Sequence, residues 1–149
     1  SKEDVISKIE TLIQEKKTLE KELEAVKARI ASKSVDNIDD DVRQINGIKV
    51  LSKRVEIENP SQLRDLADKF KAKLGSGVIL LGAESNGKAL LISMVTPDLT
   101  NEYKAGDIVK AAAMEVGGGG GGRPDMAQAG GTQPENLDKA LDTVIQNIK

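Results

Sequence analysis

The sequence predicts an α+β protein built from a long N-terminal heptad helix and a following globular mixed-sheet domain with flanking helices. Apolar residues in the first thirty positions recur at alternating spacings of four and three, which is the pattern of a heptad helix. Further along, strand-like and helix-like segments follow one another in the order β-α-β-β-α. We expect residues 1–44 to form a helical, coiled-coil-like segment with its linker, and residues 45–149 to form the globular domain.

The first helix is expected from about Glu3 to Ala31, which makes it roughly 40 Å long. Its apolar seam needs a partner, and three remain open: a second copy, another helix of the same longer protein, or the following globular body. The chain starts with Ser1 rather than Met, so we expect it to be a fragment of a longer protein. The seam positions are Val5, Ile9, Leu12, Lys16, Leu19, Leu23, Val26 and Ile30.

The stretch Ser34–Gly47 is acidic and rich in turn formers, so it is expected to be a linker. The run Asp39–Asp41 is interpreted as solvated linker charge rather than a metal cluster. Ile48–Glu58 alternates like a strand. Asn59 is the expected N-cap, with Pro60 at the first position, of a helix that Gly75 ends.

Two apolar strands follow, Gly77–Ala83 and Lys88–Val95, joined by a hairpin at Asn86-Gly87. Because both strands are apolar on both faces, the sheet should be covered on both sides. Helices are expected at about Asp107–Glu115 and Pro134–Ile148.

Composition excludes several functions. The chain has no Cys and no His, so it has no disulfide, no thiolate or imidazole metal ligand and no His general base. It has one Phe and one Tyr, too few for the aromatic platform that usually stacks single-stranded bases. Net charge is -2, and basic residues are locally in excess from Lys49 to Lys73. No apolar run reaches membrane-spanning length.

The glycine-rich segment Gly117–Gly131, "GGGGGGRPDMAQAGG", allows three interpretations. Six glycines alone favour a flexible linker. Pro124 and the apolar spacing after it favour a short helix that Gly130-Gly131 ends, so that the glycine loop, the helix N-terminus and Arg123 form an anion cradle. The third interpretation is close packing of backbone against the sheet, where side chains would not fit. The segment matches neither common nucleotide-binding glycine motif.

The same residues resemble the signature at the C-terminal end of alanine–tRNA ligases, in a globular domain type that is also attached to DHH-family phosphoesterases. The glycine run, Arg123-Pro124, Ala127-Gln128-Ala129, Gly130-Gly131 and the closing helix that begins "QPENLDKALD" all match. The phosphoesterase relatives tend to carry a His in this segment, and its absence here favours the synthetase branch. The resemblance covers essentially the whole chain.

The resemblance implies a non-catalytic, cytoplasmic tRNA-binding domain that contacts the outer corner, or elbow, of alanine-specific tRNA and helps to couple aminoacylation with editing. The alternative is a dimerisation or assembly module that acts through the heptad helix. Partners would be tRNA, other domains of the parent synthetase and a second copy, with no membrane. No cofactor is expected in this fragment, while ATP, magnesium and zinc belong to the parent family. The candidate RNA contacts are Arg123, Gly118, Gly119, Gly120, Gly121, Gly122, Lys53, Arg54, Lys69 and Lys73.

Overall fold

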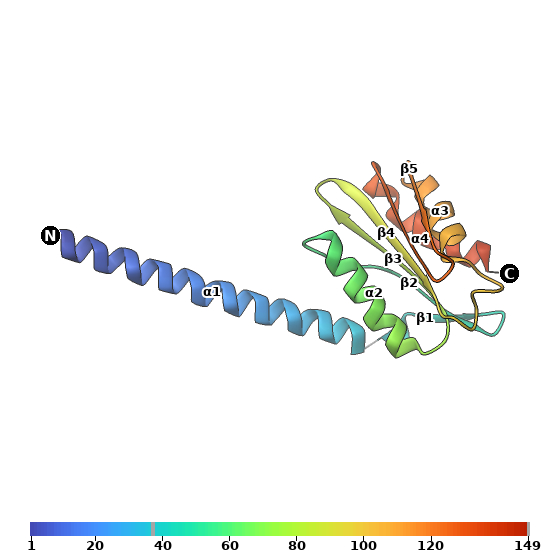
Figure 1. Ribbon diagram of the computed structural model, residues 1–149, viewed down its shortest axis with the longest axis horizontal. Helices are drawn as coiled ribbons and strands as arrows, with labels where there is room; N and C mark the ends of the chain where they lie inside the picture. Colours follow the sequence, from blue (N-terminus) through green and yellow to red (C-terminus); the bar gives the residue numbers. More distant parts are fainter. Residues whose placement is uncertain (37, 149) are drawn as a thin grey trace. The chain divides into compact units, whose positions relative to one another are not determined.

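The computed structural model describes residues 1–36 and 38–148, without the side chains of residues 30–36 and 40. The chain divides into two compact units, Ser1–Asp36 and Asn37–Lys149. The first unit is helical and the second is a sheet with flanking helices, so the predicted α+β class is confirmed (Figure 1).

Helix α1 spans Lys2–Asp36 and confirms the predicted heptad helix, which continues five residues beyond the expected end. Its described apolar seam residues are about half exposed, from 46% at Val26 to 64% at Leu19. The side chain of Ile30, the last expected seam residue, lies outside the described residues. The described part of the seam is therefore an apolar stripe that the helix itself leaves open to solvent.

The interpretation of Ser34–Gly47 as a linker is wrong. The described part of this stretch contains the end of α1, the 3₁₀ turn η1 (Ile38–Asp40) and strand β1 (Val42–Ile45). Ile38 is 1% exposed, and β1 pairs with the next strand through a two-residue turn at Asn46-Gly47. Both turn residues have positive φ, at 54° and 78°. This is the same turn signal that correctly predicted the hairpin at Asn86-Gly87.

The second unit contains a six-stranded mixed sheet in the order β1-β2-β3-β4-β6-β5. β2 and β3 are parallel, and all the other neighbouring strands are antiparallel. β1 and β5 are therefore the two edge strands. The remaining strands are β2 (Ile48–Arg54), β3 (Val78–Ser85), β4 (Lys88–Val95), β5 (Gly118–Gly122) and β6 (Met126–Gly131).

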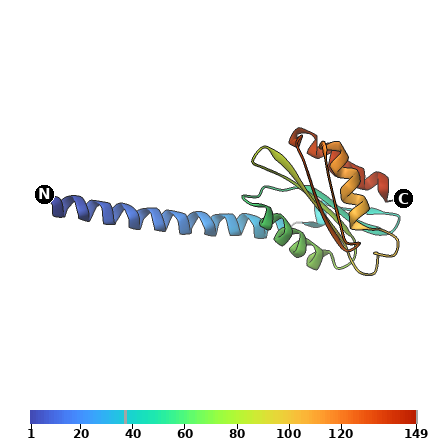
Figure 2. The same ribbon diagram turned by 45° about the horizontal axis from the view of Figure 1, so that its top comes forward.

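Helices cover both faces of the sheet, as the apolar central strands predicted. α2 (Pro60–Leu74) lies on one face, while α3 (Ala105–Glu115) and α4 (Leu137–Asn147) lie on the other (Figures 1 and 2). The backbone N–H of Gln62 donates to the Asn59 side chain, and Gly75 ends α2 with φ 76°, so both predicted caps are confirmed. The 3₁₀ turn η2 (Pro134–Asn136) leads into α4.

The side chains of β3 point alternately to the two faces of the sheet, so the buried core has two parts. Val78 and Leu80 belong to the buried cluster beneath α3 and α4, and Ile79 and Leu81 face the side where α2 packs. α2 packs against β3 and β4, whereas α3 packs against β4, β6 and β5. Within the described part of the unit Asn37–Lys149, neither α2 nor another helix packs extensively on the α2 side of the β5–β6 hairpin.

The glycine segment is a β-hairpin, so the predicted loop and short helix after Pro124, and the linker alternative, are both wrong. β5 is a strand made only of glycine, and β6 lies between β5 and β4. The three-residue spacing from Met126 to Ala129, which predicts a helical turn, lies instead in a strand whose side chains alternate every two residues. The strand signal is weak because glycine has low strand propensity and no side-chain alternation to read.

Close packing explains three glycines of β5. A Cβ added to Gly118 or Gly120 would overlap backbone atoms of β6, and one added to Gly122 would lie 2.7 Å from the Cα of Ala127. Added to Gly119 or Gly121, a Cβ would have no atom within 4 Å. The fold therefore requires glycine at alternate positions only, and Gly119 and Gly121 are not explained by packing within the chain.

We expect Gly120→Ala to lower the free energy of unfolding by about 1–3 kcal/mol, because its new methyl group overlaps Ala129 and the strands must separate. Gly121→Ala is the matched control. Its φ lies outside the left-handed range, so alanine should be neutral or stabilise by up to about 1 kcal/mol. Denaturant unfolding measures both, and equal effects of the two variants would contradict the described close approach of β5 to β6.

Candidate functional site

The turn of the β5–β6 hairpin is held by backbone hydrogen bonds from three elements. The N–H of Arg123 donates to the carbonyl of Met126 at 2.9 Å. The carbonyl of Pro124 accepts from Ala105 N–H at 2.8 Å, at the start of α3, and the carbonyl of Asp125 accepts from Val95 N–H at 3.0 Å, at the end of β4. The turn is therefore a fixed platform for the side chains it carries.

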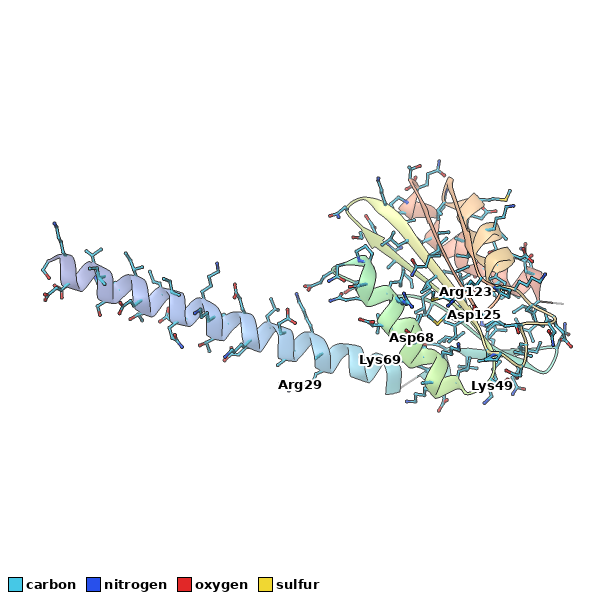
Figure 3. All side chains as sticks on the ribbon, viewed as in Figure 1. Arg29, Lys49, Asp68, Lys69, Arg123 and Asp125 are labelled. Carbon is cyan, nitrogen blue, oxygen red and sulfur yellow. The ribbon has the colours of Figure 1, made fainter. Side chains whose placement is uncertain are left out.

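Arg123 and Asp125 project from this turn as an exposed ion pair (Figure 3). Arg123 Nε lies 3.3 Å from Asp125 Oδ1, and the two side chains are 70% and 42% exposed. An ion pair at this exposure contributes roughly 0–1 kcal/mol. The pair therefore orients the guanidinium weakly and leaves most of its donors open to solvent.

One face of the hairpin is nearly free of side chains. On β6, Met126, Gln128 and Gly130 alternate onto the face opposite the α3-α4 core, and Gly121 and Gly119 lie beside the last two on β5. We call these five residues the open hairpin face. Because glycine exposes its backbone, a ligand can approach the peptide planes here more closely than at any ordinary strand.

Lys53 and Arg54, at the end of β2, lie far from Arg123. Across the sheet, Arg54 is in register with Gly82 of β3, and the row continues through β4 and β6 to Gly120. Four strand spacings separate β2 from β5, which is about 19 Å. Lys53 Nζ lies 2.8 Å from Asp41 Oδ2, and Arg54 Nη2 lies 3.4 Å from Glu84 Oε2.

A cleft of about 290 Å³ opens between β1, β2 and α4. Both Lys53 and Arg54 line it, but so do Asp138 and Asp142 from α4 and Asp41. The carboxylates make this cleft mixed in charge and therefore poorly suited to a polyanion.

Lys69 and Lys73 are exposed on α2, and Lys69 is labelled in Figure 3. They lie four residues apart on one helix face, as predicted. The candidate residues thus form three groups: the hairpin with Arg123, the end of β2, and α2. The structure brings together Arg123 and the glycines of β5, and it does not bring Lys53 and Arg54 to them.

Asp98 follows β4 at the end of the sheet that carries the hairpin turn. The hydroxyl of Ser76 donates to its carboxylate, and this bond, with a second from Thr96, lowers the pKa of Asp98 below its usual range. The folded state is therefore stabilised at pH values above the pKa that Asp98 has in the unfolded chain. This stabilisation is lost as the pH falls through the lower pKa that Asp98 has in the folded state. This end of the sheet is therefore held most firmly when Asp98 is ionised.

The described residues include no group of three or more Asp or Glu side chains placed to hold a metal ion. Within the same residues, no helix is long and apolar enough to cross a membrane. What the site offers is an exposed guanidinium, a flat backbone surface and one amide side chain, Gln128. These groups can hold a ligand by hydrogen bonds and by charge.

The chain belongs to the DHHA1 domain family, whose model matches residues 47–149. It is 52% identical over 143 residues to an alanine–tRNA ligase of Desulfosudis oleivorans and 50% identical over 142 residues to one of Chromohalobacter salexigens. Each match covers 95% of this chain and 16% of the relative. The chain therefore corresponds to a small part of these enzymes, and the predicted resemblance is confirmed.

A solved structure shares the fold. The C-Ala domain of alanyl-tRNA synthetase from Aquifex aeolicus matches with a TM-score of 0.66, covering 72% of this chain and 96% of that one. Sequence identity is 22%, so this similarity supports the fold alone.

Sequence reasoning missed Gln128 as a functional candidate, because the segment around it was interpreted as a helical turn. The alternation of Met126, Gln128 and Gly130 with buried Ala127 was the available signal. Such a two-residue alternation places the amide on the exposed face of a strand.

Arg123 could contact a ligand, or it could act only as a structural clamp on Asp125, and substitutions of the two residues distinguish these roles. Arg123→Ala should weaken binding of a polyanion such as tRNA about five- to tenfold, because one charge-assisted contact is lost. Asp125→Asn should strengthen it about two- to fivefold at low salt, because a negative charge beside the site is removed. Fluorescence anisotropy measures both affinities. If both variants bind as the wild type does and only unfold more easily, Arg123 is a structural clamp.

Proposed function

We propose that this chain is a tRNA-binding domain that contacts the elbow of alanine-specific tRNA through the β5–β6 hairpin. The observation that carries the proposal is the glycine at positions 119 and 121, where the fold has room for side chains. Glycine at these positions keeps the open hairpin face flat and lets a ligand reach the backbone. Exposed Arg123 at the adjoining turn supplies a fork suited to phosphate.

The similarity to two alanine–tRNA ligases at 50–52% identity supports tRNA as the partner. RNA helices are recognised mostly by shape, phosphates and 2′-hydroxyls, which needs no bank of aromatic side chains. A flat backbone surface beside one arginine fits this kind of recognition. The net charge of -2 fits an auxiliary contact better than a tight, independent RNA binder.

The wider role follows from the resemblance. We propose that the domain helps one tRNA serve both aminoacylation and editing, and that it works in the cytoplasm beside other domains of its parent synthetase. We further propose that the chain has no catalytic activity or cofactor of its own. ATP, magnesium and zinc would act in other parts of the parent, since this chain has neither Cys nor His to ligate zinc.

A second candidate function is assembly through α1, and the half-exposed apolar seam favours it. The flanking charges limit how two copies could pair. In a fully overlapped antiparallel pair, Lys8 would face Arg29 and Glu15 would face Glu22 of the other copy, so both pairs would repel. Lys16 would also lie within the seam. A pair of two copies should therefore be weak or shifted in register.

The tRNA proposal predicts salt-sensitive binding that depends on the open hairpin face. The chain should bind tRNA more tightly than a plain RNA duplex. The logarithm of its association constant should fall linearly with the logarithm of the salt concentration, with a slope of about 0.7–0.9 for each phosphate contacted. Gly121→Val should weaken tRNA binding severalfold without loss of stability, because the new side chain stands where the ligand approaches. Failure of the wild-type chain to prefer tRNA over the duplex would contradict the proposal.

Assembly through the seam makes a separate prediction. Sedimentation equilibrium should show a dimer at high concentration that Leu19→Asp returns to monomer, because a buried carboxylate cannot be solvated in the seam. Gln14→Asp, on the outer face of the same helix, is the matched control and should leave the dimer intact. A chain that remains monomeric up to about 1 mM would end the hypothesis that two copies pair (order of magnitude from the affinity scale).

A further inference from the structure

Gln128 has the one polar side chain among the five residues of the open hairpin face. It is exposed near the middle of β6, with Gly121 opposite on β5 and buried Ile92 opposite on β4. Met126 and Gly130 are its neighbours along the same face of β6. On this face of the hairpin, Gln128 is therefore the one described side chain that can both donate and accept hydrogen bonds.

The fold does not use this amide. Among the described side chains, which exclude those of residues 30–36 and 40, no hydrogen bond involves the Gln128 side chain, and the glycines beside it place no side-chain atoms near it. An exposed glutamine on a strand is ordinary by itself. Here, however, it rises from a surface that glycine keeps bare at two positions where the fold has room for side chains, so a ligand that rests on this surface must meet the amide.

The position of Gln128 relative to Arg123 fits a nucleic-acid strand. Gly121 pairs with Gln128, and Arg123 lies two residues further along from Gly121. Two residues of extended strand span about 7 Å. Neighbouring nucleotides of one nucleic-acid strand are a comparable distance apart, so a single stretch of backbone can reach both side chains.

We propose that Gln128 hydrogen-bonds a ribose 2′-hydroxyl and so makes this surface selective for RNA over DNA; the proposal rests on the tRNA-binding function argued above. The 2′-hydroxyl both donates and accepts, as does the glutamine amide. RNA helices display these hydroxyls in a wide, shallow minor groove that a flat surface can approach. Arg123 contacts phosphate, which RNA and DNA share, so the discrimination lies with Gln128.

The test compares tRNA with a DNA strand of the same sequence, using wild-type chain and the Gln128→Ala variant. Wild type should prefer tRNA, and Gln128→Ala should lose about three- to tenfold affinity for tRNA while its affinity for the DNA stays unchanged. Gln146→Ala, at an exposed glutamine of α4, is the matched control and should bind as the wild type does. Thermal unfolding of each variant shows that the fold is intact.

The outcomes separate the two proposals. If wild-type chain does not bind tRNA, the proposed function and this inference both fail. If Gln128→Ala retains the wild-type ratio of tRNA to DNA affinity, the inference fails while the tRNA-binding function stands. Equal losses on tRNA and DNA would also overturn it, because Gln128 would then contact a group that the two nucleic acids share.

Discussion

The close approach of β5 to β6 is the constraint on which the hairpin and its surface depend. Gly118, Gly120 and Gly122 allow it, since a methyl group at any of them would collide with β6. Glycine loses more conformational freedom on folding than other residues, so a five-glycine edge strand is unfavourable by itself. The strand is held by its pairing with β6, by the packing of α3 against it and by the backbone bonds at the turn.

The same constraint shapes the surface that faces solvent. Once glycine occupies the alternate positions for packing, glycine at Gly119 and Gly121 makes the other face of β5 bare as well. α2 stops at β3 and β4, so this face is not covered by a helix of the described unit. The proposed binding surface is thus a strand face with few side chains, and Arg123 at its turn and Gln128 at its centre are the polar groups proposed to contact the ligand.

Local signals predicted most of the fold. Asn59, Pro60 and Gly75 marked the ends of α2, Asn86-Gly87 marked the β3–β4 hairpin, and the heptad spacing marked α1. The hairpin of β5 and β6 could not be predicted in this way, because poly-glycine has neither propensity nor alternation, and its strand state comes from pairing with β6.

The candidate site, like the fold, could be predicted from the sequence only in part. Arg123 and the glycines were identified by their residue types and by resemblance, but their joint geometry needed the hairpin. Lys53 and Arg54 were identified by charge alone, and the structure pairs each of them with a nearby carboxylate.

The most direct test of tRNA binding by the hairpin is a titration of the isotopically labelled chain with tRNA, followed by backbone amide chemical shifts. We predict shifts at Gly119, Gly121, Arg123 and Gln128. Shifts confined to β2 and the cleft beside α4, with the hairpin unchanged, would contradict this prediction.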